Sequence, residues 1–203
     1  MNNINTIIFD IGNVLAEFRW KDYLDDCGYE EEVKSKIAKA TVQNKLWKEW
    51  DRGSIDETKL IDLFCQEEPS LSKEIQKFME DKLHLVREYE YAEGLVKDLR
   101  KNGYKVYLLS NYSKSHFTQC KEFFKFLPHV DGGVISYELN YVKPEPQIYE
   151  ALISKYNINP SQAVFLDDLQ ENLEGAKPFG FYTIQVRSYE EMIQELQGLG
   201  VNI

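Results

Sequence analysis

Apolar positions between residues 20 and 90 recur at helical spacing. In residues 55–66, for example, Leu60, Leu63 and Phe64 share one face of a helix. Other stretches of this region repeat the pattern, and none has the apolar run or the strict alternation of a convincing strand. The pattern therefore predicts a unit built of several amphipathic helices.

The flanking parts of the chain show a different pattern, in which short apolar runs alternate with helical stretches. Residues 4–9 form the first apolar run, and helices and strands alternate from residue 91 onward. The later expected strands are residues 105–110, 132–136, 163–168 and 182–186. Such alternation is typical of a parallel sheet covered on both faces. We therefore predict an α/β fold: a Rossmann-like three-layer α/β/α parallel sheet with an inserted helical-bundle cap.

The first apolar strand belongs with the later strands of this sheet, so the helical region interrupts one core domain. We expect a core domain formed by residues 1–17 and 91–203. The helical cap domain then comprises residues 18–90.

Composition and charge narrow the classes of function. The 203 residues are 43% hydrophobic and 29% charged, which is typical of a globular protein. The net charge of −10 opposes nucleic-acid binding, which relies on clustered Lys and Arg. It permits a small anionic substrate, because a local cation and a metal can dominate one pocket. The three cysteines and three histidines are scattered and show no zinc-site spacing.

The N-terminal apolar run fits neither a signal peptide nor a membrane span. No basic region precedes it, and Asp10 interrupts it. We therefore expect a cytoplasmic protein without a membrane partner.

Polar side chains stand where three of the expected strands end. They are Asp10, Ser110, Asn111, Asp167 and Asp168. Lys143 lies in a loop stiffened by Pro144 and Pro146. In folds of this class ligands bind outside the carboxyl ends of the strands, so these groups should converge. Crowded carboxylates need a compensating cation, and Mg²⁺ is a hard cation that takes oxygen ligands.

Each of these residues also has a plainer structural interpretation. Ser110 could start the next helix, and Asp10 could be a turn residue. Asp168 could be a helix N-cap that forms a capping box with Glu171, and Lys143 could be a solvated loop lysine. Their combination at one sheet edge favours a functional site over these separate roles.

Four motifs carry a family resemblance. "FDIGNVL", "LLSN", "VKPEPQIY" and "FLDDLQEN" occur in this order and resemble the motifs of the haloacid dehalogenase-like (HAD) hydrolase superfamily. The resemblance covers essentially the whole chain, and the helical insertion resembles the small helical cap of that family. "DRGSIDETKL" is similar to the cap segment that reaches over the active site. The first and last motifs look most like the bacterial subgroup that includes glucose-1-phosphate phosphatases.

The resemblance implies a nucleophile and a metal site. Asp10 would form an aspartyl-phosphate and would also ligate Mg²⁺ through one oxygen. The backbone carbonyl of Gly12 and the carboxylate of Asp168 would be further ligands. Asp167 would lie beside them or bind the metal through a water.

The resemblance also implies how the phosphate is held. Ser110 and the backbone of Asn111 would bind the transferring phosphoryl group, and Lys143 would neutralise charge on Asp10 and on the phosphate. Two positions depart from the family pattern. Gly12 stands where the second aspartate, the general acid and base, is usual, and Asn172 stands where many relatives carry an acid. Glu17 and Asp51 are candidates to replace the missing acid, although plain surface positions also explain them.

The cap would set substrate specificity. The candidates to line its mouth are Glu17, Trp47, Trp50, Asp51, Arg52 and Ser54. Trp47 and Trp50 have an alternative interpretation as cap core, because aromatic residues at helical spacing usually pack together.

We expect a Mg²⁺-dependent phosphatase that acts on a small phosphorylated metabolite, such as a sugar 1-phosphate. One alternative is a phosphate-ligand binding or regulatory protein that lost catalysis through Gly12. A haloacid dehalogenase is another, but it would have little use for a metal-binding acidic pair. In a phosphoaspartyl receiver the acidic pair ends the first strand, whereas here it comes last. The sequence leaves the oligomeric state open.

Overall fold

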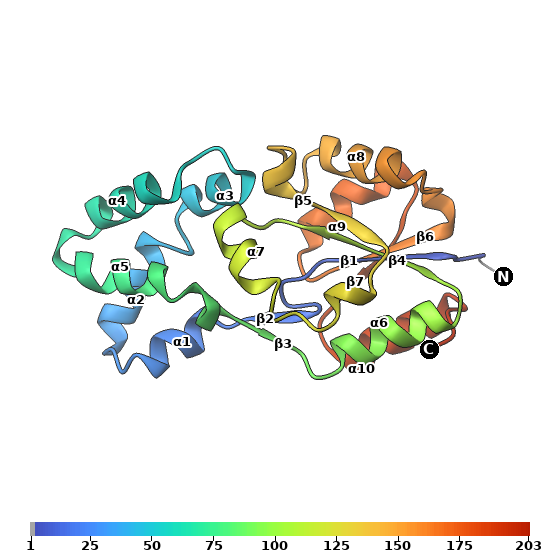
Figure 1. Cartoon of the computed structure of the whole chain (residues 1–203), viewed down its shortest axis with the longest axis horizontal. Coiled ribbons are helices and arrows are strands. Elements are labelled where there is room, and N and C mark those ends of the chain that lie inside the picture. The colour runs from blue at the N-terminus through green and yellow to red at the C-terminus, as the bar shows by residue number, and fades with distance from the viewer. Residues whose placement is uncertain (1–2) are drawn as a thin grey trace.

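The computed structural model describes residues 3–203, and its centre is a parallel five-stranded sheet (Figure 1). The strand order is β5-β4-β1-β6-β7. The strands are β1 (Thr6–Phe9), β4 (Lys105–Ser110), β5 (Gly132–Ile135), β6 (Ala163–Asp167) and β7 (Tyr182–Gln185). The predicted three-layer α/β/α fold is therefore confirmed.

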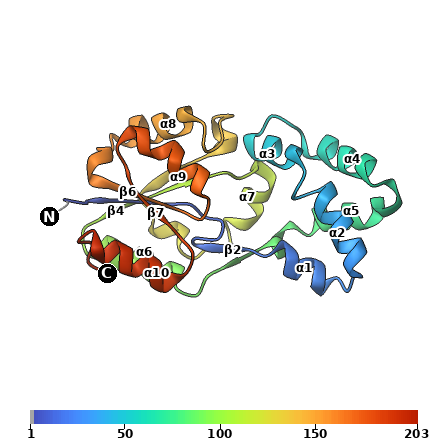
Figure 2. The same cartoon turned by 180° about the vertical axis from the view of Figure 1, so that it is seen from behind.

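Helices cover both faces of the sheet, as Figures 1 and 2 show from opposite sides. One face carries α6 (Ala92–Lys101) and α10 (Tyr189–Gly198), and the other carries α8 (Pro146–Tyr156) and α9 (Gln170–Ala176). The helix that follows β4 is α7 (Lys114–Cys120), which lies next to the helical unit.

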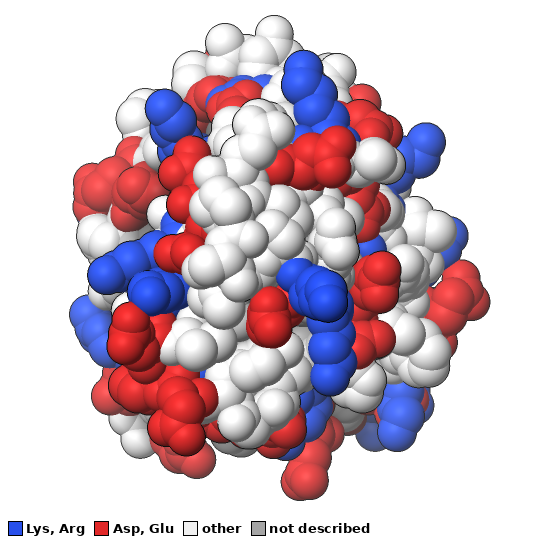
Figure 3. Space-filling model, turned by 90° about the vertical axis from the view of Figure 1, so that its left-hand side faces the viewer, with Lys and Arg blue, Asp and Glu red and all other residues white. Residues whose placement is uncertain are grey.

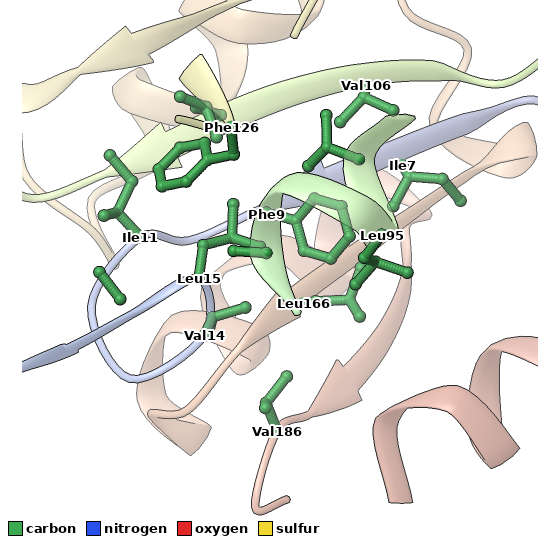
Figure 4. Packing of buried hydrophobic residues seen from close by; sticks show 14 of the residues in the cluster. Ile7, Phe9, Ile11, Val14, Leu15, Leu95, Val106, Phe126, Leu166 and Val186 are labelled. Atoms are coloured by element: carbon green, nitrogen blue, oxygen red, sulfur yellow. The ribbon is translucent and has the colours of Figure 1, made fainter. Parts of the chain in front are cut away.

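The central position of β1 in the sheet explains why its residues are almost all apolar. Ile7 and Phe9 point to the face covered by α6 and α10, where Figure 4 shows them packed near Leu95 and Leu166. Ile8 points to the opposite face. A central strand that is buried on both sides cannot alternate apolar with polar residues, so it reads as a continuous apolar run.

Residues from Trp20 to Glu80 form a separate helical unit at one end of the molecule (Figure 2). Its helices are α1 (Trp20–Asp26), α2 (Glu31–Ala40), α3 (Lys45–Arg52), α4 (Glu57–Glu67) and α5 (Ser72–Glu80). They bury a core of their own, which includes Leu24, Trp50 and Phe64. The side chain of Asp56 caps α4 by accepting from the N–H groups of Thr58 and Lys59.

Local backbone geometry also ends α3. Gly53 follows the helix at φ +78°, the left-handed conformation in which glycine costs least. A side chain at this position would also crowd Tyr137 of the core, at 3.3 Å. The sequence therefore allows the end of α3 to approach the core closely.

A short antiparallel ribbon connects the helical unit to the sheet. It pairs β2 (Ala16–Phe18) with β3 (Val86–Glu88). The expectation that residues 20–90 hold no strand is therefore wrong at residues 86–88. The predicted domain boundaries fall within and just after this ribbon, and the division into two domains stays a prediction.

Short 3₁₀ helices complete the described elements. They are Pro69–Leu71, Lys82–Leu85, Leu127–His129, Ser136–Glu138, Pro160–Gln162 and Lys177–Phe179. Among residues 3–203, no helix combines the length and the apolar character that crossing a membrane requires. Figure 3 looks onto the helical unit and shows acidic and basic side chains intermingled over that face.

Candidate active site

The register of the sheet brings three polar strand ends together. Phe9 pairs with Leu108 of β4 and with Leu166 of β6, so all three strands end at one edge. There the hydroxyl of Ser110 donates to Asp10 Oδ1 at 2.7 Å. Asp10, Ser110 and the Asp167–Asp168 pair thus share one site, as the sequence analysis expects.

Asp10 is the centre of this arrangement and is only 7% exposed. Its Oδ1 accepts from the Ile11 N–H at 2.7 Å and from the Lys143 ammonium at 2.9 Å, besides Ser110. Burial raises the pKa of the Asp10 carboxyl to about 7, and repulsion from neighbouring carboxylates adds to the rise, while Lys143 opposes it. In the folded protein, the positive charge of Lys143 therefore only partly offsets the burial of Asp10 and the repulsion from its neighbours.

Lys143 is the cation of the site, and its side chain is fully buried. Its Nζ lies 2.6 Å from Asp167 Oδ2 as well as 2.9 Å from Asp10 Oδ1. Burial by itself would lower the pKa of Lys143, but the two carboxylates outweigh it and raise the pKa. Lys143 is therefore a permanently charged group rather than a solvated loop lysine.

The side chain of Asn111 holds the backbone of Lys143. Asn111 Oδ1 accepts from the Lys143 N–H at 2.8 Å, and its Nδ2 donates to the Lys143 carbonyl at 3.1 Å. This amide-to-backbone pair joins the end of β4 to the lysine loop and fixes where the ammonium stands.

Asp167 is buried and its hydrogen-bonding capacity is well used. Besides Lys143, it accepts at Oδ1 from the Leu169 N–H and from Asn172 Nδ2, each at 2.9 Å. Asn172 is the residue that departs from the family's usual acid. An amide there donates to Asp167, whereas a second carboxylate would add repulsion in a buried position.

Asp168 lies at the rim and is held by Asn13, whose Nδ2 donates to Asp168 Oδ2 at 2.9 Å. The N-cap residue of α9 is Leu169, so Asp168 does not cap this helix. Burial raises the pKa of Asp168, and the hydrogen bond from Asn13 opposes this. Asn13 adopts a left-handed backbone, φ +54°, which asparagine tolerates better than most residues.

The three carboxylates form a cluster whose spacing suits a metal ion. One oxygen from each of Asp10, Asp167 and Asp168 lies within 4.8 Å of the others. Lys143 is a single buried cation that pairs with Asp10 and Asp167, so the three acids together lack positive charge. An all-oxygen donor set of this kind suits a hard divalent cation such as Mg²⁺.

A cavity of about 390 Å³ opens above the cluster. Its floor includes Asp10, Gly12 and Lys143, and its wall includes residues of the ribbon and the helical unit: Phe18, Val42, Asn44, Trp47, Lys48, Asp51 and Val86. The helical unit therefore contributes to the same cavity as the strand ends.

Two of the six specificity candidates, Trp47 and Asp51, line this cavity. Trp50 is 3% exposed in the core of the helical unit, stacked on His116 with ring centroids 6.0 Å apart. Trp47 packs edge-on against Trp50 and also against Phe18. The two tryptophans are thus packed, as one interpretation holds, and Trp47 also faces the cavity.

The remaining specificity candidates, Glu17, Arg52 and Ser54, contact neighbouring side chains and are not among the residues that line the cavity. Arg52 binds Glu145 of the core at 2.6 Å, and its side chain is 20% exposed. Ser54 Oγ donates to Glu49, and Glu17 pairs with Arg87 across the ribbon. Any role of these three in specificity stays a prediction.

Sequence reasoning did not assign two residues of the site. Asn13 holds Asp168, and the side chain of Asn172 orients Asp167. The signal available for Asn13 is an asparagine beside a glycine at the end of a strand, a pair that favours positive φ. For Asn172, the sequence shows only that an amide replaces the acid of the family motif.

A sequence model of the haloacid dehalogenase-like hydrolases matches residues 4–180. D-ribitol-5-phosphate phosphatase of Bacteroides thetaiotaomicron is 28% identical, with 95% of this chain and 97% of that protein covered. Sesquiterpene phosphatase of Aspergillus oryzae is 23% identical, with 95% and 94% covered. Rat bifunctional epoxide hydrolase 2 is 38% identical over 69 residues, which are 12% of its length.

Solved structures share the fold. A HAD family enzyme from Bacteroides thetaiotaomicron superimposes with a TM-score of 0.73 at 22% identity, covering 96% of this chain and 98% of that one. A dehalogenase superimposes with a TM-score of 0.77 at 18% identity over the whole of both chains. The match of the family model to residues 4–180 shows that the chain belongs to the haloacid dehalogenase-like hydrolases.

Proposed function

We propose that this hydrolase is a Mg²⁺-dependent phosphatase that transfers the phosphoryl group of a small metabolite to Asp10. The ion pair between Lys143 and Asp10, at the floor of a cavity that Asp168 also lines, carries this proposal. The expected class of enzyme, a HAD-like phosphatase, agrees with the two phosphatases that match nearly the whole chain.

The hydrogen bonds of Asp10 distinguish its two oxygens. Among the described residues, the three donors at this carboxylate all bind Oδ1. Oδ2 is therefore the oxygen we assign to attack on phosphorus. The new bond joins Oδ2 to phosphorus while the bond from phosphorus to the ester oxygen breaks. Water then cleaves the acyl phosphate, which releases inorganic phosphate and restores Asp10.

The charges of the site suit this reaction. Two anions, a carboxylate and a phosphate, must approach each other, so their repulsion must be masked. Lys143 supplies one fixed positive charge without reorganising, because Asn111 and Asp167 hold it. Asp10, Asp168 and the Gly12 carbonyl would hold Mg²⁺, with Asp167 beside them, and the bound ion would neutralise further negative charge.

The cavity favours a small organic phosphate. Apolar groups of Phe18, Trp47 and Val86 line one part, and polar groups of Asn44 and Lys48 line another. A polyol or sugar offers both hydroxyl groups and C–H surface to such a wall. Within this class we propose a sugar 1-phosphate, because its anomeric leaving oxygen is more acidic than that of a primary alcohol.

A second candidate function is a phosphate-binding or regulatory protein, and the absence of a side chain at Gly12 favours it. The two functions differ in turnover. A screen of phosphorylated metabolites with Mg²⁺ should find at least one that yields many equivalents of phosphate per protein. Binding without release, or a single labelling of the protein, would contradict the phosphatase.

Asp168→Asn should raise the Mg²⁺ concentration that half-maximal activity requires by at least about tenfold. The amide is a poorer ligand for a hard cation than the carboxylate, although it can still accept from Asn13. The measurement is phosphate release across a Mg²⁺ titration. Glu174→Gln is the matched control, because Glu174 is an exposed acid on α9 paired with Lys177.

An unchanged Mg²⁺ requirement in Asp168→Asn would contradict the ligand assignment. Undiminished activity of the wild-type protein in excess chelator would contradict the metal requirement itself.

A further inference from the structure

Phosphoryl transfer from an alkyl ester raises a question about protons. The departing oxygen must acquire a proton, and the attacking water must later lose one. Gly12, which lines the cavity beside Asp10, has no side chain to do either. Asp10, Lys143 and Asp168 are already assigned to attack, charge neutralisation and metal binding. Another group in the cavity must therefore handle the proton.

We propose that Asp51, at the end of α3, is the acid that protonates the leaving oxygen and the base that then activates water. This inference rests on the proposed phosphatase function. The proton balance closes: Asp51 gives its proton to the ester oxygen as Asp10 is phosphorylated. As a carboxylate it takes a proton from the water that cleaves the acyl phosphate.

The backbone around Asp51 is anchored to the core. Ser136 Oγ donates to the Asp51 carbonyl at 2.5 Å. Next along the chain, Asn140 Nδ2 donates to the Arg52 carbonyl at 3.0 Å, and the Arg52 guanidinium binds Glu145. These contacts join the last turn of α3 to the loop after β5. A residue of the helical unit is thereby fixed at the wall of a cavity whose floor is Asp10.

The Asp51 carboxyl is placed to hold a proton near neutral pH. Burial raises the pKa of Asp51 to about 8, and the nearby Asp10 adds to the rise. A hydrogen bond with the Ser113 backbone and the charge of Lys143 oppose it. Asp51 and Asp10 line the same cavity, so a protonated Asp51 carboxyl is available in the space where the ester would bind.

The remaining titratable groups of the cavity are less suited. His116 Nε2 lies 3.1 Å from the Lys82 carbonyl, so this nitrogen donates there, and burial lowers the pKa of the ring to about 3. Burial also holds the pKa of the Tyr112 hydroxyl well above its usual value. Lys48 and Glu171 are exposed on the rim. Glu171 is thus the one rival carboxyl among the described lining residues.

The test uses leaving groups of different acidity. An aryl phosphate departs as a stable phenolate, whereas a primary sugar 6-phosphate departs as an alkoxide that needs a proton. In Asp51→Asn, the pre-steady-state burst of alcohol from the 6-phosphate should slow by about 10²–10⁴-fold. The burst from the aryl phosphate should change little. Steady-state release should fall for both, because cleavage of the acyl phosphate loses its base.

Matched variants separate the possible outcomes. Asp62→Asn removes an exposed acid of α4 outside the cavity and should leave both bursts unchanged. The proposal would be overturned if Asp51→Asn slowed both bursts equally or slowed neither. It would also be overturned if Glu171→Gln, and not Asp51→Asn, selectively slowed the burst from the 6-phosphate. Asn can still accept from Ser113, and should this variant not fold, Asp51→Ser should show the same selectivity. A wild-type protein that turns over no phosphate ester would instead contradict the proposed function.

Gly12→Asp provides a rescue. A Cβ at Gly12 meets no atom within 4 Å, so the site has room for a side chain. In the Asp51→Asn background, Gly12→Asp should restore the 6-phosphate burst by at least about tenfold, because a second acid then enters the cavity. In the wild-type background the gain should be small. Equal gains in both backgrounds would mean that Asp51 is not the donor.

Discussion

Asp10→Asn should lower phosphate release by at least about 10⁴-fold, since it removes the nucleophile itself. An amide neither attacks phosphorus well nor binds a hard cation well. The substitution keeps the size of the side chain, and the amide oxygen can still accept from Ser110 and from the Ile11 N–H. We therefore expect a folded protein that still binds substrate.

The measurement pairs turnover with thermal unfolding. Loss of turnover with an unchanged melting transition would assign the effect to chemistry. Substantial turnover in a well-folded Asp10→Asn protein would remove Asp10 from its role.

Lys143→Met should damage both stability and catalysis. The ammonium is the buried partner of Asp10 and Asp167, and its loss leaves a fully buried carboxylate uncompensated. Breaking a buried ion pair on one side typically costs about 3–5 kcal/mol of unfolding free energy. Removing a preorganised charge from the reacting phosphate should also lower kcat by about 10²–10³-fold.

Arg52→Ala is the control for Lys143→Met. Arg52 also contacts two carboxylates, Glu145 and Glu49, but it lies outside the cavity and is partly exposed. Loss of the Arg52 side chain should lower the free energy of unfolding by no more than about 1 kcal/mol. Activity on an aryl phosphate should fall far less in Arg52→Ala than in Lys143→Met. Denaturant unfolding measures the stability of both variants, and an aryl phosphate assay measures their activity. Equal effects of the two substitutions would contradict a special role for Lys143.

The sequence predicts the centre of the sheet because strands β1, β4 and β6 are buried on both faces. Each of these three strands is a short apolar run, and the polar residue that stops the run marks the end of the strand. Asp10, Ser110 and Asp167 are found in this way, and parallel pairing places them at one edge. The motif resemblance places Lys143 beside Asp10, whereas its second ion pair, with Asp167, is seen only in the structure.

Other features depend on contacts that leave no local pattern. The ribbon of β2 and β3 has only three residues in each strand, too few for periodicity to reveal. Arg52 is paired with Glu145, 93 positions away, and nothing in either segment specifies the partner. The wall of the cavity is likewise set by how the helical unit meets the core. Helical spacing marks Trp47 and Trp50 as packed without showing that Trp47 also lines the cavity.

The identity of the phosphorylated residue tests the central claim most directly. The wild-type protein would be mixed with Mg²⁺ and an aryl phosphate, quenched in acid during turnover, and its peptides analysed by mass spectrometry. We predict an acid-stable, base-labile phosphoryl group on the peptide that contains Asp10, located to that carboxylate by hydride reduction. Continued phosphate release with the label on another residue, or with no covalent label in repeated early quenches, would contradict the account.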